Sequence, residues 1–288
     1  MKKKDNKFKI LIPKGRLFSA VAKLLHDTGL FPEITDQTYL IPSADPEIKA
    51  KLMKPQNIPD LVELGSYDAG FTGFDWILEK NARVEIIMDL GFNPVRIVSA
   101  TARQNSIRKL KNRKIIVASE YKNLAEKYLE EKGFDYHFIR TFGATEAYPP
   151  EDADIIIDNT ATGRTLKENG LKIVDVILHS STRLIINPSI ISDSWKKEKL
   201  EEILTLIKAV LNARERVMLE MNVGADKLEE IVKILPCMRA PTVAPLYNGT
   251  GYAVKVAVKK KQVPRLIPML KKLGATDILE YEFRKVII

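Results

Sequence analysis

Residues 155–166 read Ile-Ile-Ile-Asp-Asn-Thr-Ala-Thr-Gly-Arg-Thr-Leu, an apolar run followed by a loop of small and hydroxyl-bearing residues. The pattern predicts a buried strand that turns tightly into a helix. Free backbone N–H groups in such a turn can hold a phosphate monoester. Gly163 would let the backbone approach the phosphate oxygens, and Asp158 would hold a sugar diol or a magnesium-bound water. The alternative is a capped turn without a ligand, because Thr and Asp are ordinary N-cap residues.

A second apolar run, Lys-Ile-Leu-Ile-Pro-Lys-Gly-Arg-Leu at residues 9–17, also turns at a glycine into an amphipathic helix. Gly29 is placed to end that helix. Ligands of open α/β sheets bind at the carboxyl ends of the strands, and this turn carries Lys14 and Arg16. We expect both side chains to contact a polyphosphate, although basic residues at strand ends are commonly just solvated. The apolar face of the predicted helix consists of Leu17, Val21, Leu24 and Leu25.

These two segments are part of a set of seven motifs whose order along the chain resembles the ATP phosphoribosyltransferase family. The resemblance covers nearly the whole chain, and its last two motifs resemble the carboxy-terminal regulatory domain of the family's long form. The motifs are Pro-Lys-Gly-Arg-Leu at 13–17, Tyr-Asp-Ala-Gly-Phe-Thr-Gly-Phe-Asp at 67–75, Asp-Leu-Gly-Phe at 89–92, the loop at 158–166, Ser-Thr-Arg-Leu-Ile-Ile-Asn-Pro at 181–188, Leu-Pro-Cys-Met-Arg-Ala-Pro-Thr-Val-Ala-Pro-Leu at 235–246 and Gly-Ala-Thr-Asp-Ile-Leu at 274–279.

The resemblance implies the first step of histidine biosynthesis, in which ATP and 5-phosphoribosyl 1-pyrophosphate give N1-(5-phosphoribosyl)-ATP and diphosphate. It also implies feedback inhibition by histidine, dependence on Mg²⁺ with ligands left unassigned, and a homo-oligomer between dimer and hexamer. Diphosphate is a good leaving group once magnesium and basic residues hold its charge, so no covalent protein nucleophile is needed. The chain carries no Ser-His-Asp or Cys-His signature.

The resemblance also assigns residues to roles. Asp75 matches the end of the second motif, where an aspartate could equally cap the helix that follows it. The residues expected to bind substrate are Asp75, Asp158, Thr160, Ala161, Thr162, Gly163, Arg164 and Thr165, and those expected to act on diphosphate or triphosphate in catalysis are Lys14 and Arg16. The residues expected to bind histidine are Asn222, Thr242 and Ala275, which could also simply cap or turn the chain.

The sequence departs from the family's signature at two places. The residue after the loop aspartate is usually aliphatic, and here it is Asn159. A glutamate upstream is normally followed by a loop that contains a glycine, whereas the loop after Glu146 is shorter by one residue and lacks it. The role of Glu146 as a ligand is therefore left open.

The composition bounds the remaining classes of protein. The chain has 288 residues and 45% hydrophobic content, enough for two or three domains with their own cores. A net charge of +9 would permit nucleic acid, but the lysines are dispersed and the runs at 2–4 and 259–261 lack interleaved aromatics. Small polyanionic substrates or a solvated, lysine-rich surface explain the excess of positive charge better than nucleic acid does. No nucleic-acid partner is therefore expected. One cysteine, Cys237, excludes an intrachain disulfide, and no apolar run approaches a membrane span, which favours a cytoplasmic protein.

Hydrophobic periodicity predicts the domain organisation. The fold class is α/β, with a two-lobed unit like the type II periplasmic-binding proteins and a carboxy-terminal ferredoxin-like βαββαβ domain. The resemblance implies that the two-lobed unit is catalytic, that its second lobe binds the phosphoribosyl group and that the carboxy-terminal domain is regulatory. Residues 1–96 and 183–215 would form lobe I, residues 97–182 the phosphoribosyl-binding lobe II, and residues 216–288 the regulatory domain. Pro268 lies within a predicted helix without an evident reason. The rival interpretations are a non-catalytic two-lobed protein that binds small anions and a phosphoribosyltransferase for another base.

Overall fold

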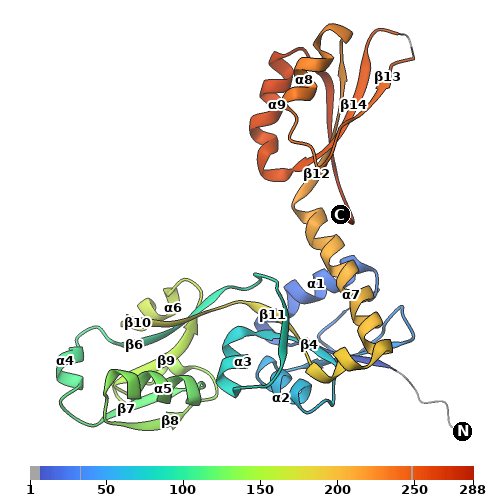
Figure 1. The fold of residues 1–288 in the computed structure, drawn as a ribbon. Coiled ribbons are helices and arrows are strands. Elements are labelled where there is room, and N and C mark those ends of the chain that lie inside the picture. Colours follow the sequence, from blue (N-terminus) through green and yellow to red (C-terminus); the bar gives the residue numbers. More distant parts are fainter. Residues whose placement is uncertain (1–6, 33, 248) are drawn as a thin grey trace, which may run out of the picture. The chain divides into compact units, whose positions relative to one another are not determined.

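The computed structural model describes residues 7–32, 34–247 and 249–288, so the lysine run at 2–4 lies outside the described residues. It divides the chain into two compact units (Figure 1). The first unit contains the described residues up to Lys23 together with residues 31–197, and the second contains residues 24–30 and 198–288. Both units are α/β, as the sequence predicts.

The six-stranded sheet of the first unit has the order β2-β3-β1-β4-β11-β5. Its central strands β1 (Phe8–Pro13), β3 (Ile48–Met53) and β4 (Ala69–Gly73) are parallel, as expected for strands joined by helices. The outer strands make the sheet mixed, because β2 (Leu40–Ile41) and β11 (Thr182–Ile186) run antiparallel to their neighbours. The remaining elements are α1 (Phe18–Thr28), α2 (Ile58–Glu63), α3 (Phe74–Lys80) and β5 (Glu85–Asp89).

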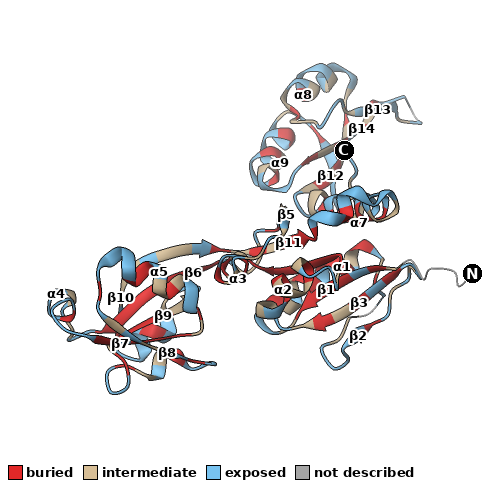
Figure 2. Ribbon diagram, turned by 60° about the horizontal axis from the view of Figure 1, so that its bottom comes forward, coloured by how far each residue is buried: buried red, intermediate tan, exposed pale blue. Residues whose placement is uncertain are grey.

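The five-stranded sheet of the first unit has the order β10-β6-β9-β7-β8. Strands β7 (Ile115–Ser119), β8 (Tyr136–Arg140) and β9 (Ile155–Thr160) are parallel, whereas β6 (Val95–Ala102) is antiparallel to both β9 and β10 (Leu171–Ser180). The isoleucines of β9 are fully buried, with Ile155 and Ile157 in one core cluster and Ile156 in another. This alternation explains why all three are apolar, since both faces of the strand are covered (Figure 2). The helices are α4 (Ile107–Leu110), α5 (Lys122–Lys132) and α6 (Arg164–Glu168).

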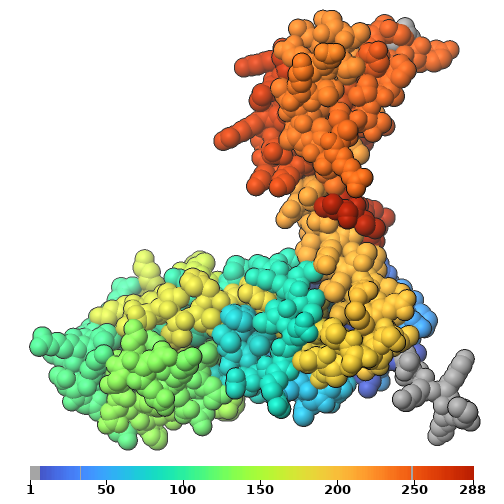
Figure 3. Space-filling view, viewed as in Figure 1, coloured from blue at the N-terminus to red at the C-terminus, as the bar shows by residue number. Residues whose placement is uncertain are grey.

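The chain crosses between the two sheets twice, once before β6 and once between β10 and β11. The crossings lie side by side because β6 and β10 are paired up to Val95 and Ser180. Figure 3 shows the surface over this region, with the yellow atoms of the second crossing beside the blue-green atoms of the first. The second crossing ends in β11, which inserts between β4 and β5.

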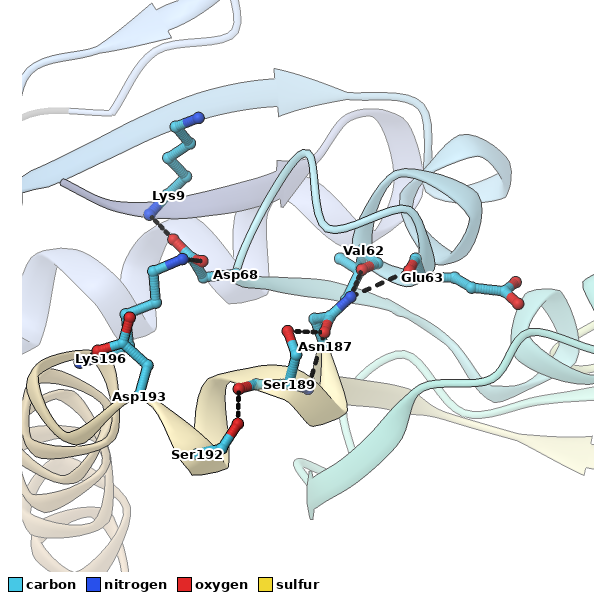
Figure 4. Close-up of polar contacts among 9 residues, drawn as sticks. All are labelled: Lys9, Val62, Glu63, Asp68, Asn187, Ser189, Ser192, Asp193 and Lys196. Atoms are coloured by element: carbon cyan, nitrogen blue, oxygen red, sulfur yellow. Dashed lines mark hydrogen bonds and ion pairs between the residues drawn. The ribbon is translucent and has the colours of Figure 1, made fainter. Parts of the chain in front are cut away.

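A polar network fixes the exit from β11 (Figure 4). The side-chain amide of Asn187 donates to the carbonyls of Val62 and Glu63 at 2.7 and 3.0 Å, and its oxygen accepts the N–H of Ser189 at 2.8 Å. Nearby, the buried carboxylate of Asp68 accepts the Lys9 N–H at 2.7 Å and pairs with the Lys196 ammonium at 2.7 Å. Each of these buried polar groups thus has a partner. The bonds of Asn187 hold the end of β11 to α2, and those of Asp68 hold β1 to Lys196.

The second unit begins along α7 (Ser194–Arg214) and continues as a ferredoxin-like domain with the strand order β13-β14-β12-β15. Alternate residues of β12 (Arg216–Val223) are buried, namely Val217, Leu219, Met221 and Val223, and they pack against the domain's helices in one core. The other elements are α8 (Leu228–Ile234), β13 (Thr242–Pro245), β14 (Tyr252–Lys259), α9 (Val263–Lys272) and β15 (Thr276–Glu282). The short 3-10 helices of the chain are η1 (Gly15–Leu17), η2 (Pro55–Asn57), η3 (Thr145–Ala147), η4 (Pro188–Ser192), η5 (Ala225–Lys227) and η6 (Lys260–Gln262).

Helix α9 continues through Pro268, which is exposed. A proline inside a helix removes one backbone hydrogen bond, and on an exposed face water can satisfy the freed carbonyl. The opposite face of α9 buries Val263, Leu266 and Leu270 in the domain core, and this packing holds the helix together across the proline.

Candidate active site

A cavity of ≈ 370 Å³ opens in the first unit where β9 ends. It collects the loop after β9, two carboxylates from neighbouring connections and one arginine from the turn after β1. Parallel strands end at the same edge of a sheet, which explains why Glu120 after β7 meets the loop after β9. Arg16 reaches the same cavity from the six-stranded sheet. The cavity is lined by Arg16, Val95, Glu120, Gly143, Ala144, Thr145, Glu146, Asp158, Asn159, Thr160, Ala161, Thr162, Arg164, Thr165 and Leu166.

The loop after β9 has the backbone geometry that the sequence predicts. Gly163 has a φ of +81°, a conformation that favours glycine, and it precedes the first residue of α6. The Thr160 hydroxyl accepts the Gly163 N–H at 2.9 Å, and the Thr162 hydroxyl accepts the Arg164 N–H at 3.3 Å. The hydroxyl oxygens thus stabilise the turn, as the alternative interpretation requires. Each hydroxyl hydrogen still remains able to donate to a ligand.

Three carboxylates face this cavity. Burial first, and then the negative charges of Glu146 and Glu120, raise the pKa of Asp158 from 3.8 to about 7, while a backbone hydrogen bond from Asn159 opposes the rise. Burial also raises the pKa of Glu120, although Lys54 and Arg140 oppose the effect. Such a concentration of acidic groups is costly without a ligand, and it is typical of functional sites.

The structure places Glu146 at the cavity despite its altered loop, and it adds Glu120, which the sequence analysis missed. Glu120 directly follows β7, and β7 is the parallel neighbour of β9. An acidic residue at the carboxyl end of the strand beside β9 could therefore have been recognised from the sequence as a candidate for the cavity.

The two basic residues of the first turn are separated in the structure. Arg16 lines the cavity, and its Nη1 donates to the carbonyl of Asn93 at 3.0 Å while the Asn93 side-chain amide donates to the carbonyl of Arg16 at 3.1 Å. The Lys14 ammonium instead lies 3.9 Å from the centroid of the Tyr39 ring, and Lys14 is not among the lining residues. Arg16 therefore lies at the cavity beside the loop after β9, whereas Lys14 does not.

Asp75 is fully buried and does not line the cavity. Its carboxylate accepts the Tyr121 hydroxyl at 2.8 Å and the Ser180 hydroxyl at 2.5 Å. The suggestion that Asp75 caps α3 is wrong, because the N-cap position belongs to Gly73 and Asp75 lies in the first turn. A β-carbon on Gly73 would lie 2.2 Å from Oδ1 of Asp75, so this close approach requires the glycine.

The three residues expected to bind histidine lie in the second unit. Asn222 donates to Asp277 at 2.9 Å, Thr242 is exposed at the start of β13, and Ala275 is buried in the domain core. Asn222 pairs with Ala253 and Thr242 pairs with Lys255 in the same central strand β14, so both occupy the sheet face away from the helices, two strands apart. The sheet spacing separates their backbone positions by about 12 Å.

Comparison with known proteins identifies the chain. The family model described as ATP phosphoribosyltransferase matches residues 54–209, and that of the HisG C-terminal domain matches residues 213–285. The chain belongs to the ATP phosphoribosyltransferase family. It is 40% identical to the ATP phosphoribosyltransferase of Pelotomaculum thermopropionicum, over 98% of this chain and 99% of that protein. It is 37% identical to that of Thermodesulfovibrio yellowstonii, over 99% of each chain.

A solved relative agrees with this assignment. A chain of the ATP phosphoribosyl transferase (HisG:HisZ) complex from Thermotoga maritima is 32% identical, with a TM-score of 0.62 over 69% of this chain and 96% of that one. The protein is thus a phosphoribosyltransferase that catalyses the first step of histidine biosynthesis, and the expected two-part α/β fold is confirmed. Within the described residues no helix is long and apolar enough to cross a membrane.

The reaction of this family depends on a divalent metal. In the described part of the chain no three His, Cys, Asp or Glu side chains are grouped so that they could hold a metal ion by themselves. The cavity nevertheless offers carboxylate oxygens from Asp158, Glu146 and Glu120. This donor set fits a hard cation that receives most of its ligands from substrate phosphates and water, as Mg²⁺ commonly does.

Proposed function

We propose that the cavity after β9 binds 5-phosphoribosyl 1-pyrophosphate and is the site where its ribose is transferred to ATP. The observation that carries the proposal is the juxtaposition of a glycine-centred loop, a largely buried aspartate and Arg16 around one cavity. The backbone and hydroxyl groups of residues 160–165 would hold the 5-phosphate, and Asp158 would accept the ribose hydroxyls. This set of groups suits a phosphorylated sugar better than a bare anion, which would not need the carboxylate.

The residues of this chain supply binding and electrostatics to the transfer. A ring nitrogen of adenine attacks the anomeric carbon, the new C–N bond forms, and the C–O bond to diphosphate breaks with its electrons going to the diphosphate. Arg16 would stabilise the charge that develops on this leaving group. Orienting both substrates in one site can lower the barrier by on the order of 7 to 11 kcal/mol.

Mg²⁺ is the divalent cation that we propose for this step. Asp158 and Glu146 would hold it, and it would neutralise charge on the diphosphate. Its arrival would also offset the mutual repulsion of the cavity's carboxylates. We further propose that the enzyme works in the cytoplasm, where its nucleotide substrate is made and used.

The function is tested by incubating the purified protein with ATP, 5-phosphoribosyl 1-pyrophosphate and Mg²⁺ while following diphosphate release. We expect diphosphate and N1-(5-phosphoribosyl)-ATP in equal amounts. Release with another nucleobase in place of ATP would favour a different phosphoribosyltransferase. Binding of the sugar diphosphate without turnover under any condition would favour the non-catalytic interpretation.

The loop hypothesis predicts the effect of Gly163→Val. A valine at a φ of +81° is strained, so the loop should shift and the KM for 5-phosphoribosyl 1-pyrophosphate should rise at least about tenfold. The matched control is Gly170→Val, which imposes a similar strain at a φ of +70° beyond α6 with no atom within 4 Å of its β-carbon. Steady-state kinetics of both variants decide the matter. Equal KM values in the two would remove the loop from the site.

We also propose that the second unit mediates feedback inhibition by histidine and that the enzyme is a homo-oligomer. Asn222 and Thr242 lie on the sheet face that the domain's own helices leave uncovered, so the site would form where two such domains pair. Hydroxyl, amide and backbone groups of Asn222, Thr242 and Ala275 are adequate partners for the ammonium and carboxylate of histidine. Inhibition requires that histidine bind two conformations with different affinity.

Thr242→Val tests this proposal because it removes one hydroxyl while keeping the shape of the side chain. The concentration of histidine that halves the activity should rise about tenfold, as expected for a lost hydrogen bond. Thr205→Val, on the exposed side of α7, is the control, and histidine should inhibit it as it inhibits the wild type. Sedimentation with and without histidine should show a change in assembly. Wild-type activity that is indifferent to millimolar histidine would refute the regulation and leave the catalytic proposal standing.

A further inference from the structure

Asn159 occupies the link between the cavity and a buried polar chain. Its backbone N–H donates to Oδ1 of Asp158 at 2.7 Å, and its side-chain Nδ2 reaches the same oxygen at 3.3 Å. The same Nδ2 donates to the Tyr121 hydroxyl at 3.2 Å. Asn159 also lines the cavity, so this amide stands between the proposed sugar-binding carboxylate and the interior.

Tyr121 is a rigid anchor for this amide. The tyrosine is buried, stacks on Trp76 with ring centroids 4.6 Å apart, and donates its hydroxyl proton to Asp75 at 2.8 Å. Asp75 is held in turn by the Ser180 hydroxyl at the end of β10. Because the tyrosine proton is committed to Asp75, the phenolic oxygen can only accept from Asn159. Asp158 when ionised also only accepts, so both neighbours of the amide require its donor end.

We infer that Asn159 is a positioning residue for the transfer reaction, tying the Asp158 carboxylate to the buried Tyr121–Asp75 pair so that it faces the ribose hydroxyls. The inference rests on the proposed function for its consequence in catalysis, but the contact itself is independent of it. An aliphatic side chain at this position would fill the same space and leave Asp158 and Tyr121 each without this donor.

Two bonds from Asn159 reach Asp158, and they differ in what a change of side chain removes. The backbone N–H bond at 2.7 Å does not depend on the side chain. The side-chain amide is what connects Asp158 to Tyr121, so without it the carboxylate keeps its local bond and loses its connection to the buried pair. A carboxylate held less firmly toward the ribose hydroxyls orients the sugar less well, which lowers kcat/KM.

The test uses Asn159→Leu, which keeps the approximate volume of the side chain and removes its donor. The kcat/KM for 5-phosphoribosyl 1-pyrophosphate should fall about fivefold, while the KM for ATP and the Tm stay near those of the wild type. Tyr121→Phe removes the other end of the same bond and keeps the stacked ring. If the bond acts as a unit, the double variant should lose no more kcat/KM than Tyr121→Phe alone. Additive losses in the double variant would overturn the inference.

A measurement on the ligand-free protein tests the contact apart from the proposed sugar site. The NMR signal of the Asn159 side-chain amide should shift in Tyr121→Phe, because the amide loses its acceptor. Asn159→Gln keeps the amide and should retain more kcat/KM than Asn159→Leu. An amide signal that is the same in the wild type and Tyr121→Phe, or equal losses in the two Asn159 variants, would overturn the inference. A shifted signal with kcat/KM unchanged in Asn159→Leu would uphold the contact and contradict the proposed sugar site instead.

Discussion

Replacing Asp158 with asparagine is expected to lower kcat/KM at least about 100-fold while making the ligand-free protein more stable at pH 8. The amide has one acceptor oxygen where the carboxylate has two, and it contributes no charge toward a cation, which together account for the loss. The gain in stability has a separate cause, because the wild-type protein must hold a buried negative charge beside Glu146 and Glu120.

The pH dependence of this gain follows from the sign of the pKa change. A rise of the Asp158 pKa from 3.8 to about 7 means a cost on the order of 4 kcal/mol for ionising the group in the folded protein. The group's contribution to stability is fully present below the unfolded pKa near 4 and is lost as pH rises through 7. Asparagine escapes this loss, so the difference in Tm between variant and wild type should be near zero at pH 4 and grow toward pH 8.

Calorimetry of both proteins between pH 4 and pH 8 measures this difference. If half of the cost is relieved, the Tm of the first unit should rise by about 5 °C at pH 8. Asp135→Asn is the matched control, since Asp135 is exposed in the connection just before β8 and lies outside the cavity. It should change neither Tm nor activity. An Asp158→Asn protein that retains full activity, or that is less stable than the wild type at pH 8, would contradict the assignment of this carboxylate.

The second large effect is expected from Arg16→Ala. We expect kcat/KM to fall about 100-fold with the thermal midpoint retained, because an exposed arginine adds little to folding but stabilises the departing diphosphate. Lys14→Ala is the matched control from the same turn, and the position of Lys14 over Tyr39 predicts a much smaller loss. Steady-state kinetics and a melting curve for each variant are sufficient. Equal losses in the two would restore Lys14 to the site, and a loss of stability in Arg16→Ala with activity preserved would assign it a structural role.

The elements of the fold could be predicted from local patterns. The apolar runs at 10–12, 115–118 and 155–157 each form a buried strand, and Gly29, Gly133 and Gly274 follow helices with positive φ as their positions suggest. The direction of β6, β10 and β11 was not accessible in this way. Strand direction depends on which edge of a sheet the chain returns to, and that is set by tertiary packing and not by periodicity.

The geometry of the candidate site was predictable where it depends on backbone conformation and less so where it depends on side-chain direction. The loop at 160–165 was found because a glycine with positive φ and flanking hydroxyls leaves a sequence signal. Asp75 and Lys14 carry the right chemistry in the right motifs, yet one is buried against Tyr121 and the other lies over an aromatic ring. Contacts between distant segments decide such orientations. Glu120 and Asn159 acquire their significance in the same way, from neighbours that only the folded sheet supplies.

Hydrogen–deuterium exchange with and without 5-phosphoribosyl 1-pyrophosphate and Mg²⁺ tests the central claim most directly. If the backbone N–H groups of the loop after β9 hold the 5-phosphate, peptides that cover residues 158–168 should exchange more slowly when the substrate is bound. Peptides of the second unit should be unaffected by this ligand and respond to histidine instead. Unchanged exchange in residues 158–168 at saturating substrate, with protection elsewhere in the first unit, would contradict the account.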